Sequence, residues 1–347
     1  MLRFASESLI AHNAGANLLA INMFEVARSE KVTALRNIST LDALFEEANR
    51  LNLRPGWIDG EKPIFWPEPK SNFVPAQWHY EEIKALMDSA GRVVDVSLAE
   101  RRNFALRNPA DDNFRTVRTL NGAYQMILPG ELAASHRHSS HALRFILDGK
   151  GTFSVVNGEK MPMETGDVVL TPGWYWHGHG HEGDKPAYWV DVLDVPLTQL
   201  FESMFFEEYP NRYETIVSVA TASPFRFSNE SIIKGLDNAS SDPDGFHGPR
   251  IHLPTPDLPM MGLSMERLDA GSKTRRQRST ANHIFVVAEG RGETTVGAEV
   301  FIWQPGDIFA VPTWNKYEHK AIRDSVLFVV SDEPLMRSSK YYRFEAD

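Results

Sequence analysis

Short strand-like segments separated by turn signals fill this chain from about Val117 onward, and one block of them occurs twice. The block "HALRFILDGKGTFSVVNGEKMPMETGDVVLTPGWYWH" is echoed by "HIFVVAEGRGETTVGAEVFIWQPGDIFAVPTWNKYEH". In each copy a Gly-Asp pair is followed by a proline six residues after the glycine (Gly166 to Pro172, Gly306 to Pro312). Short segments rich in β-branched and aromatic residues are typical of sandwiches and barrels. The repeat therefore predicts a mainly β protein with two copies of one β-barrel.

The first third of the chain has a different pattern. The segments "STLDALFEEANRLN" and "HYEEIKALMDSAG" have the apolar spacing of helices, and Ser39 with Asp42 resembles a capping pair. Between them, five prolines are interleaved with aromatic residues in "RPGWIDGEKPIFWPEPKSNFVPAQWHY". This density of proline excludes a regular helix and predicts an extended arm. We expect its aromatics to pack on another surface, of this chain or of a neighbouring subunit.

The overall composition excludes several classes of function. A formal net charge of −10 argues against a nucleic-acid partner, which needs a basic face. The chain has no cysteine, so histidine and carboxylate are the metal ligands it offers. No run of eighteen apolar residues is present, and the N-terminus lacks the cationic start of a signal peptide. We therefore expect a cytoplasmic protein with a small-molecule partner.

Histidines are concentrated in the first copy of the repeat, in "SHRHSSHALRF" and "WYWHGHGH". On a strand, His136 and His138 face one side, and so do His177 and His179. If both sides look into one barrel, His136, His138 and His177 converge, and three imidazoles suit Fe(II), Mn(II), Cu(II) or Zn(II). Either histidine pair alone could be a surface strand or a loop. Their joint occurrence at strand positions of one barrel favours a metal site.

Arg144 shares the predicted inward side with these histidines. A buried guanidinium without a partner is costly, and a substrate carboxylate would offset that cost through a bidentate pair. The alternative is that Arg144 pairs with an internal acid such as Asp191, which lies two residues after Trp189 on a predicted strand. His179 has the position to hydrogen-bond a substrate oxygen or act as acid or base. It could equally be a supporting histidine.

These residues fit two motifs of the cupin family. "GELAASHRH" matches glycine, five residues and His-x-His, and "GDVVLTPGWYWH" matches glycine, five residues, proline and a final histidine. Seven residues before the closing Gly149, where cupins usually have a glutamate ligand, this chain has Ala142. It therefore resembles the cupins that bind metal through three histidines.

The chain more closely resembles the gentisate 1,2-dioxygenases and their salicylate and 1-hydroxy-2-naphthoate relatives. The segments "LPGELAASHRHSSHALRFILDGKG", "TPGWYWHGHG" and "AERR" ahead of "NPA" carry this resemblance, which runs from about Asn49 to the C-terminus. It implies a bicupin that uses O2 to open a 2-hydroxybenzoate between its carboxyl-bearing C1 and hydroxyl-bearing C2. It also implies a homo-oligomer, a tetramer, and Fe(II), with Mn(II) as the other candidate, on His136, His138 and His177.

The resemblance also assigns residues that bind the substrate. Arg144 and Arg101 or Arg102 fix the carboxylate, and Gln125 matches a pocket position. Relatives usually have an aromatic residue and then a glycine ahead of this glutamine, where this chain has Asn121 and Ala123. Gentisate is thus the first expected substrate, and a 5-substituted salicylate or 1-hydroxy-2-naphthoate follows closely.

The second copy of the repeat lacks the metal ligands. Motif spacing places Gln277 and Ser279 at the His-x-His positions, Tyr317 at the third histidine and His283 at the glutamate. We therefore predict a metal-free, structural barrel. The predicted regions are 1–110 (helices and arm), 111–200 (metal-binding cupin barrel), 201–250 (linker with helical segments) and 251–347 (second, metal-free cupin barrel).

Two other functions compete with the dioxygenase. A non-catalytic cupin could bind a small aromatic anion as a sensor or store, with any metal. A cupin isomerase acting on a sugar phosphate would usually keep the glutamate ligand, and Ala142 argues against it.

Overall fold

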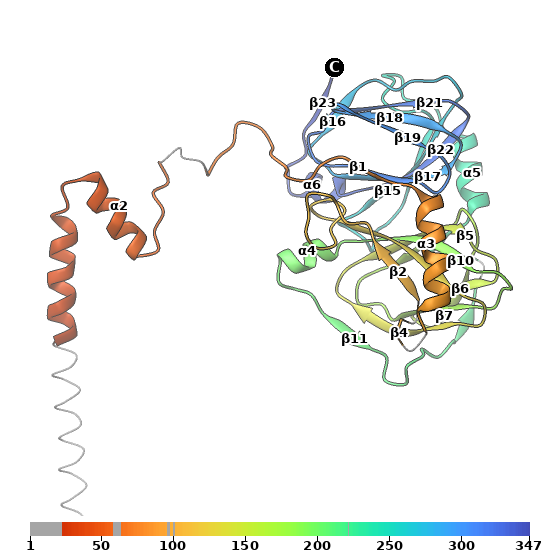
Figure 1. Cartoon of the computed structure of the whole chain (residues 1–347), viewed down its shortest axis with the longest axis horizontal. Coiled ribbons are helices and arrows are strands. Elements are labelled where there is room, and N and C mark those ends of the chain that lie inside the picture. Colours follow the sequence, from red (N-terminus) through yellow and green to blue (C-terminus); the bar gives the residue numbers. More distant parts are fainter. Residues whose placement is uncertain (1–22, 58–63, 96–97, 100, 221) are drawn as a thin grey trace, which may run out of the picture. The chain divides into compact units, whose positions relative to one another are not determined.

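The computed structural model describes residues 23–57, 64–95, 98–99, 101–220 and 222–347 (Figure 1). It divides into two compact units, Met1–Pro67 and Glu68–Asp347. Among the described residues, no helix has the length and apolar character needed to cross a membrane.

The first unit contains a helical stretch at residues 23–36 and helix α2 (Leu41–Arg50). The Thr40 hydroxyl caps α2 by accepting a hydrogen bond from the Ala43 N–H at 3.3 Å, so the predicted cap at Ser39 was wrong by one residue. In the arm, Trp57 and Phe65 are exposed, and residues 58–63 lie outside the described ranges. Further along the arm, Phe73 is buried beneath Arg115 and Arg118, and Trp78 packs against a core cluster of the barrels. Packing on a surface of this chain is therefore confirmed for these two residues, and for Trp57 and Phe65 it stays a prediction.

The first barrel consists of two six-stranded sheets. One has the order β13 (Arg226–Phe227), β8 (Val168–Thr171), β5 (Ala142–Asp148), β10 (Ala187–Leu193), β3 (Asn121–Ile127), β2 (Arg102–Ala105). The other has the order β11 (Phe206–Glu208), β4 (Leu132–His138), β9 (His177–His181), β6 (Thr152–Val156), β7 (Glu159–Met163), β12 (Ser218–Val219). Between β6 and β7, Asn157 and Gly158 both have positive φ (46° and 81°), as a type I′ turn requires.

The second barrel repeats this arrangement, which confirms the predicted bicupin fold. Its six-stranded sheet has the order β1 (Ala76–Trp78), β20 (Ile308–Val311), β17 (His283–Glu289), β22 (Ser325–Ser331), β15 (Gly262–Leu268), β14 (Arg250–Leu253). Its five-stranded sheet has the order β19 (Glu299–Trp303), β18 (Gly292–Val296), β21 (Tyr317–Ala321), β16 (Gln277–Ser279), β23 (Phe344–Ala346). The predicted region boundaries stay predictions; β1 precedes the first barrel in sequence but joins a sheet of the second.

Helices lie beside the sheets of the second unit: α3 (Tyr80–Val93), α4 (Val195–Leu200), α5 (Asn229–Asp237), α6 (Glu333–Ser338). The duplication extends to two of them. Helix α4 follows β10 and is preceded by Asp194, whose carboxylate accepts a hydrogen bond from the His141 N–H at 2.7 Å. Helix α6 follows β22 and is preceded by Asp332, which accepts a hydrogen bond from the Asn282 N–H at 2.7 Å.

Apolar side chains form three buried clusters that explain this architecture. Alternation along each strand sends one set of residues inside its barrel, including Ile146 and Trp189 in the first and Phe285 and Leu327 in the second. The opposite faces of the sheet that contains β5 and of the sheet that contains β17 contribute to a shared cluster, in which the rings of Phe145 and Phe328 stack with centroids 5.1 Å apart. Burial of this shared face holds the barrels together.

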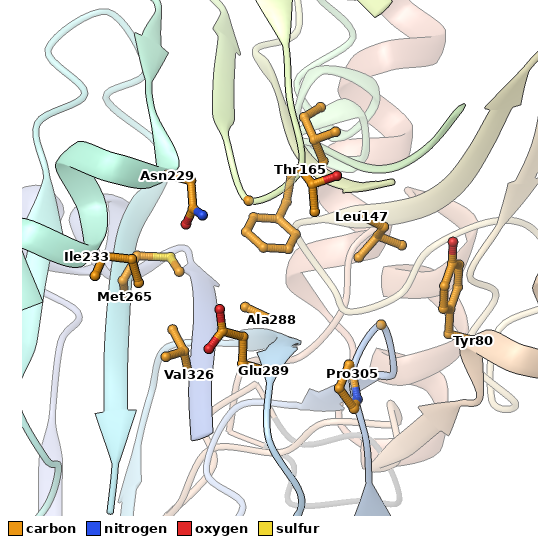
Figure 2. Close-up of a pocket in the computed structure, with 14 residues that line it drawn as sticks. Tyr80, Leu147, Thr165, Asn229, Ile233, Met265, Ala288, Glu289, Pro305 and Val326 are labelled. Carbon is orange, nitrogen blue, oxygen red and sulfur yellow. The ribbon is translucent and has the colours of Figure 1, made fainter. Parts of the chain in front are cut away.

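A hollow of about 140 Å³ interrupts the packing between the barrels (Figure 2). Leu147 of β5 and Thr165 line it from the first barrel, and Met265 of β15 and Val326 of β22 line it from the second. None of the site residues predicted from the sequence lies on its walls. The candidate site is therefore elsewhere, inside the first barrel.

Candidate metal and substrate site

His136, His138 and His177 converge inside the first barrel. One nitrogen from each ring can be chosen so that all three lie within 4.8 Å of one another. His136 and His177 are direct cross-strand partners on β4 and β9, with ring centroids 4.4 Å apart. The run "HGHGH" is the buried strand β9, not a loop. Among the described residues, this is the one group of three or more potential ligands with metal-binding spacing.

The hydrogen bonds of the three rings orient them as metal ligands. Each Nδ1 lies near a backbone carbonyl oxygen: Ala134 for His136 (3.2 Å), Ser140 for His138 (2.7 Å), Tyr175 for His177 (3.0 Å). A carbonyl can only accept, so each Nδ1 carries the proton and each Nε2 keeps a free lone pair. Ligand histidines in metal sites are held in this way. The buried Nε2 of His177 has no hydrogen-bond partner among the described residues, so its lone pair is available to a metal ion.

Burial keeps the three imidazoles neutral at pH 7. It lowers the pKa of His136 to about 3, with Arg101 adding to the effect, and lowers the pKa of His138 to about 4. The pKa of His177 is also far below its ordinary value, first because of burial and then because of His136. A metal therefore does not have to displace protons from these nitrogens at neutral pH.

Arg144 lies beside the histidines and is fully buried. Strand register places it opposite Asp191 on β10. Its Nε is 3.3 Å from an Asp191 oxygen, an ion-pair distance without hydrogen-bond geometry, and its Nη1 donates to the Thr171 hydroxyl at 2.5 Å. Asp191 is thus an internal acid at ion-pair distance from Arg144, which was the alternative to a substrate carboxylate in the sequence analysis. Its Nε still has no hydrogen-bond acceptor among the described residues, so a substrate carboxylate remains compatible with this position.

The other predicted residues share the face of the sheet that carries Arg144. On β3, Asn121, Ala123 and Gln125 lie opposite Leu193, Asp191 and Trp189 of β10, respectively. All three are buried, and the Asn121 Oδ1 has no hydrogen-bond partner among the described residues. Gln125 donates to Asp191 and accepts from the Arg101 Nε at 2.5 Å. A hydrogen-bonded chain thus joins Arg101, Gln125 and Asp191 next to Arg144.

The structure separates the two adjacent arginines that the sequence left as alternatives. Arg101 reaches Gln125, and its charge acts on His136 and His179. Arg102 points to the other side of β2, where its Nη1 donates to both oxygens of Glu131 at 2.5 Å and its Nη2 donates to the Val94 carbonyl. Only Arg101 is therefore placed beside the histidines.

His179 is the remaining predicted site residue. It is buried, its ring centroid is 6.1 Å from that of His177, and it also lies beside Trp189. Both ring nitrogens lack a hydrogen-bond partner among the described residues. Burial and then Arg144 lower its pKa well below the ordinary value, so the ring is neutral and offers one donor and one acceptor. His181, by contrast, is held by Thr152 and the Lys185 carbonyl.

Two residues next to the site were missed by the sequence analysis. Thr171 accepts from Arg144, although it looks like any strand-end threonine. Phe206 belongs to the predicted linker but forms strand β11 beside β4, where its ring stacks on His136 at 5.1 Å. Nothing in the local pattern of "ESMFFEEYP" indicates this pairing.

Comparisons with known proteins agree with this geometry. Residues 123–193 match the model of the cupin domain. Gentisate 1,2 dioxygenase 1 from Aquipseudomonas alcaligenes is 34% identical over 321 residues, which cover 84% of this chain and 92% of that protein. The chain belongs to the gentisate 1,2-dioxygenase family.

Other members of the gentisate 1,2-dioxygenase family support the assignment. The 5-aminosalicylate 1,2-dioxygenase of a Comamonas species is 30% identical, over 88% of this chain and 90% of its own length. The crystal structure of salicylate 1,2-dioxygenase from Pseudoaminobacter salicylatoxidans with gentisate has a TM-score of 0.82 and 28% identity, and the match covers 90% and 95% of the two chains. These relatives are ring-cleaving dioxygenases, and this chain is an oxidoreductase of that class.

Proposed function

We propose that this enzyme opens the ring of a 2-hydroxybenzoate between C1 and C2, with O2 and an Fe(II) ion held by His136, His138 and His177. The observation that carries the proposal is the convergence of three neutral histidines, each with its Nδ1 fixed, next to the buried Arg144. Imidazole ligands suit Fe(II), and Mn(II) is the nearest alternative. The relatives are a gentisate and a 5-aminosalicylate 1,2-dioxygenase, which favours gentisate or a 5-substituted salicylate as the substrate of this enzyme.

An ion held by His136, His138 and His177 would supply coordination positions for the substrate and O2 and would allow electron transfer between them. The protein groups have separate tasks. Arg144 and Arg101 bind the substrate carboxylate, since guanidinium groups match carboxylates in charge and shape. His179 accepts the phenolic proton or holds the phenolic oxygen by a hydrogen bond. Trp189 and Ile146, both buried, exclude water from the ring.

We further propose that the enzyme works in the cytoplasm as a homo-oligomer, with four subunits as the family resemblance implies. Exposed apolar side chains support association: Phe201, Phe205, Phe206 and Val217 all lie in the segment that follows β10. Exposed groups of this kind mark interaction surfaces on soluble proteins.

Oxygen uptake by the iron-loaded chain tests the proposed activity. We expect uptake with gentisate, salicylate, 5-aminosalicylate or 1-hydroxy-2-naphthoate, and none with benzoate, which lacks the hydroxyl. Binding of the hydroxybenzoates without any oxygen uptake would instead identify a non-catalytic cupin.

Arg101→Met and Arg102→Met should have different effects, although the two residues are neighbours. Loss of Arg101 should raise KM by about tenfold, the effect of one lost charged hydrogen bond to substrate. Loss of Arg102 leaves the nearly buried Glu131 without its partner and should lower the melting temperature instead. Steady-state kinetics and thermal unfolding of both variants check this; an unchanged KM in Arg101→Met removes that residue from the substrate site.

Asn121 and Ala123 should set the preference at the ring's 5-position. The Asn121 amide can donate to a substituent that only accepts hydrogen bonds, and the Ala123 methyl restricts the ring's placement. Asn121→Ala and Ala123→Gly should shift the kcat/KM ratio of gentisate to 5-nitrosalicylate by about tenfold. If neither variant changes the ratio, these positions do not control specificity.

A further inference from the structure

In the second barrel the described residues form no group of three potential ligands with metal-binding spacing, but they enclose a cavity of about 220 Å³ with polar groups on its walls. Arg250 and His252 come from β14, His283 from β17, Tyr317 from β21 and Arg337 from α6. His283 and Tyr317 occupy two of the positions that carry metal ligands in related barrels. The cavity is therefore the counterpart of the candidate site in the first barrel, with different chemistry.

Strand register shows that the arginine of this cavity does not lie at the position that corresponds to Arg144 of the first barrel. In the first barrel Arg144 lies opposite Asp191, and the corresponding pair in the second barrel is Phe285 opposite Val329. The guanidinium comes instead from Arg250, which lies opposite Glu266 on β15. The second barrel thus has Phe285 at the position of Arg144 and carries its arginine on β14, the edge strand of the same sheet.

Two buried nitrogen atoms of residues that line the cavity have no hydrogen-bond partner among the described residues. Arg250 donates through Nη2 to Glu266 at 2.6 Å, but its buried Nε has no hydrogen-bond partner among the described residues. The buried His283 Nδ1 also lacks a partner within the described chain. Glu266, the buried partner of Arg250, already accepts hydrogen bonds from Arg250 and from the Gly248 N–H. A guanidinium group can only donate hydrogen bonds, so a ligand that binds the Arg250 Nε must provide an acceptor atom.

The charges around the cavity favour an anion. Burial and then Arg250 lower the pKa of His283 to about 3, so this ring is neutral and has one N–H. Burial raises the pKa of Tyr317, and its hydroxyl is therefore protonated at pH 7. Two arginines, Arg250 and Arg337, and one acid, Glu333, line the cavity, and Glu333 pairs with Arg337 at 2.6 Å, so the charge on the lining is positive.

We propose that the second barrel binds a small organic carboxylate, no larger than one six-membered ring, in the cavity bounded by Arg250, His283 and Tyr317. The carboxylate accepts hydrogen bonds from these three groups. The body of the ligand lies against the apolar wall formed by Leu263, Val329 and Pro334. The volume fits one ring, because a cavity of about 150 Å³ is already enough for benzene.

Two measurements on the full-length, iron-loaded chain test this site. Crystals soaked with 4-bromobenzoate should show anomalous bromine density in the second barrel. In solution, the ¹⁹F NMR spectrum of 4-fluorobenzoate should contain a bound resonance that persists in Arg144→Lys, because that variant alters only the first barrel. Bromine density confined to the first barrel, or a spectrum in which every bound resonance depends on Arg144, would overturn the proposal.

Variants of the second barrel sharpen the test. Arg250→Gln combined with Glu266→Gln removes both charges without leaving one unpaired, and His283→Phe removes only the imidazole. Each should weaken 4-fluorobenzoate binding to this site at least about tenfold. Lys320→Gln with Glu293→Gln removes an exposed ion pair of the same barrel and should change nothing. Unchanged affinity in folded His283→Phe and in the Arg250/Glu266 variant contradicts the assignment.

Discussion

His177→Ala should leave the chain without bound iron and lower the rate of ring opening by more than about a hundredfold. Loss of a group that only orients a ligand already costs 10- to 100-fold in affinity or activity, and this change removes a ligand itself. Wild-type protein should contain about one metal ion per chain, because the described residues form one suitable group of ligands. Elemental analysis and oxygen uptake on the same samples check both statements.

Tyr317→Phe is the matched control for this prediction. Tyr317 occupies the third-ligand position of the second barrel, so its replacement should leave the metal content unchanged. A second metal equivalent of similar affinity in the wild type, or full metal retention in His177→Ala, would show that the site has been placed wrongly.

Arg144→Lys should raise KM for a 2-hydroxybenzoate by about 10- to 100-fold, which corresponds to 1.4–2.8 kcal/mol. Lysine keeps the positive charge beside Asp191 but lacks the planar fork that matches a carboxylate. Iron content should not change, since Arg144 is not a ligand. Kinetics, metal analysis and thermal unfolding of one preparation give the three readouts.

Asp191→Asn separates the two roles that Arg144 can have. If Arg144 serves only its internal ion pair, then Arg144→Lys and Asp191→Asn should both lower the melting temperature and leave KM unchanged. If Arg144 binds substrate, the lysine variant alone should show the large increase in KM.

The sequence predicted the parts of this molecule that depend on local periodicity. Alternation along "SHRH" and "WYWHGHGH" was enough to bring His136, His138 and His177 together, because strand parity fixes the side on which each residue lies. The two repeated barrels followed from the self-similarity of two blocks of the sequence.

Contacts between distant segments could not be predicted in the same way. Arg101 and Arg102 are adjacent, and only the pairing of β2 with β3 decides which one reaches Gln125. The sequence left open whether Arg144 pairs with Asp191 or with a substrate, because the register between two strands cannot be deduced from either strand alone. Phe206 lies against His136 through a strand pairing that no pattern in its own segment indicates.

Isotope labelling tests the central claim most directly. The iron-loaded enzyme is supplied with ¹⁸O₂ and with the 2-hydroxybenzoate that gives the fastest oxygen uptake, and the product is analysed by mass spectrometry. The account predicts a ring-opened product that carries both atoms of one O2 molecule, formed by the wild type and not by His177→Ala. A product with one labelled oxygen and an intact ring, or equal product formation by the variant, would contradict it.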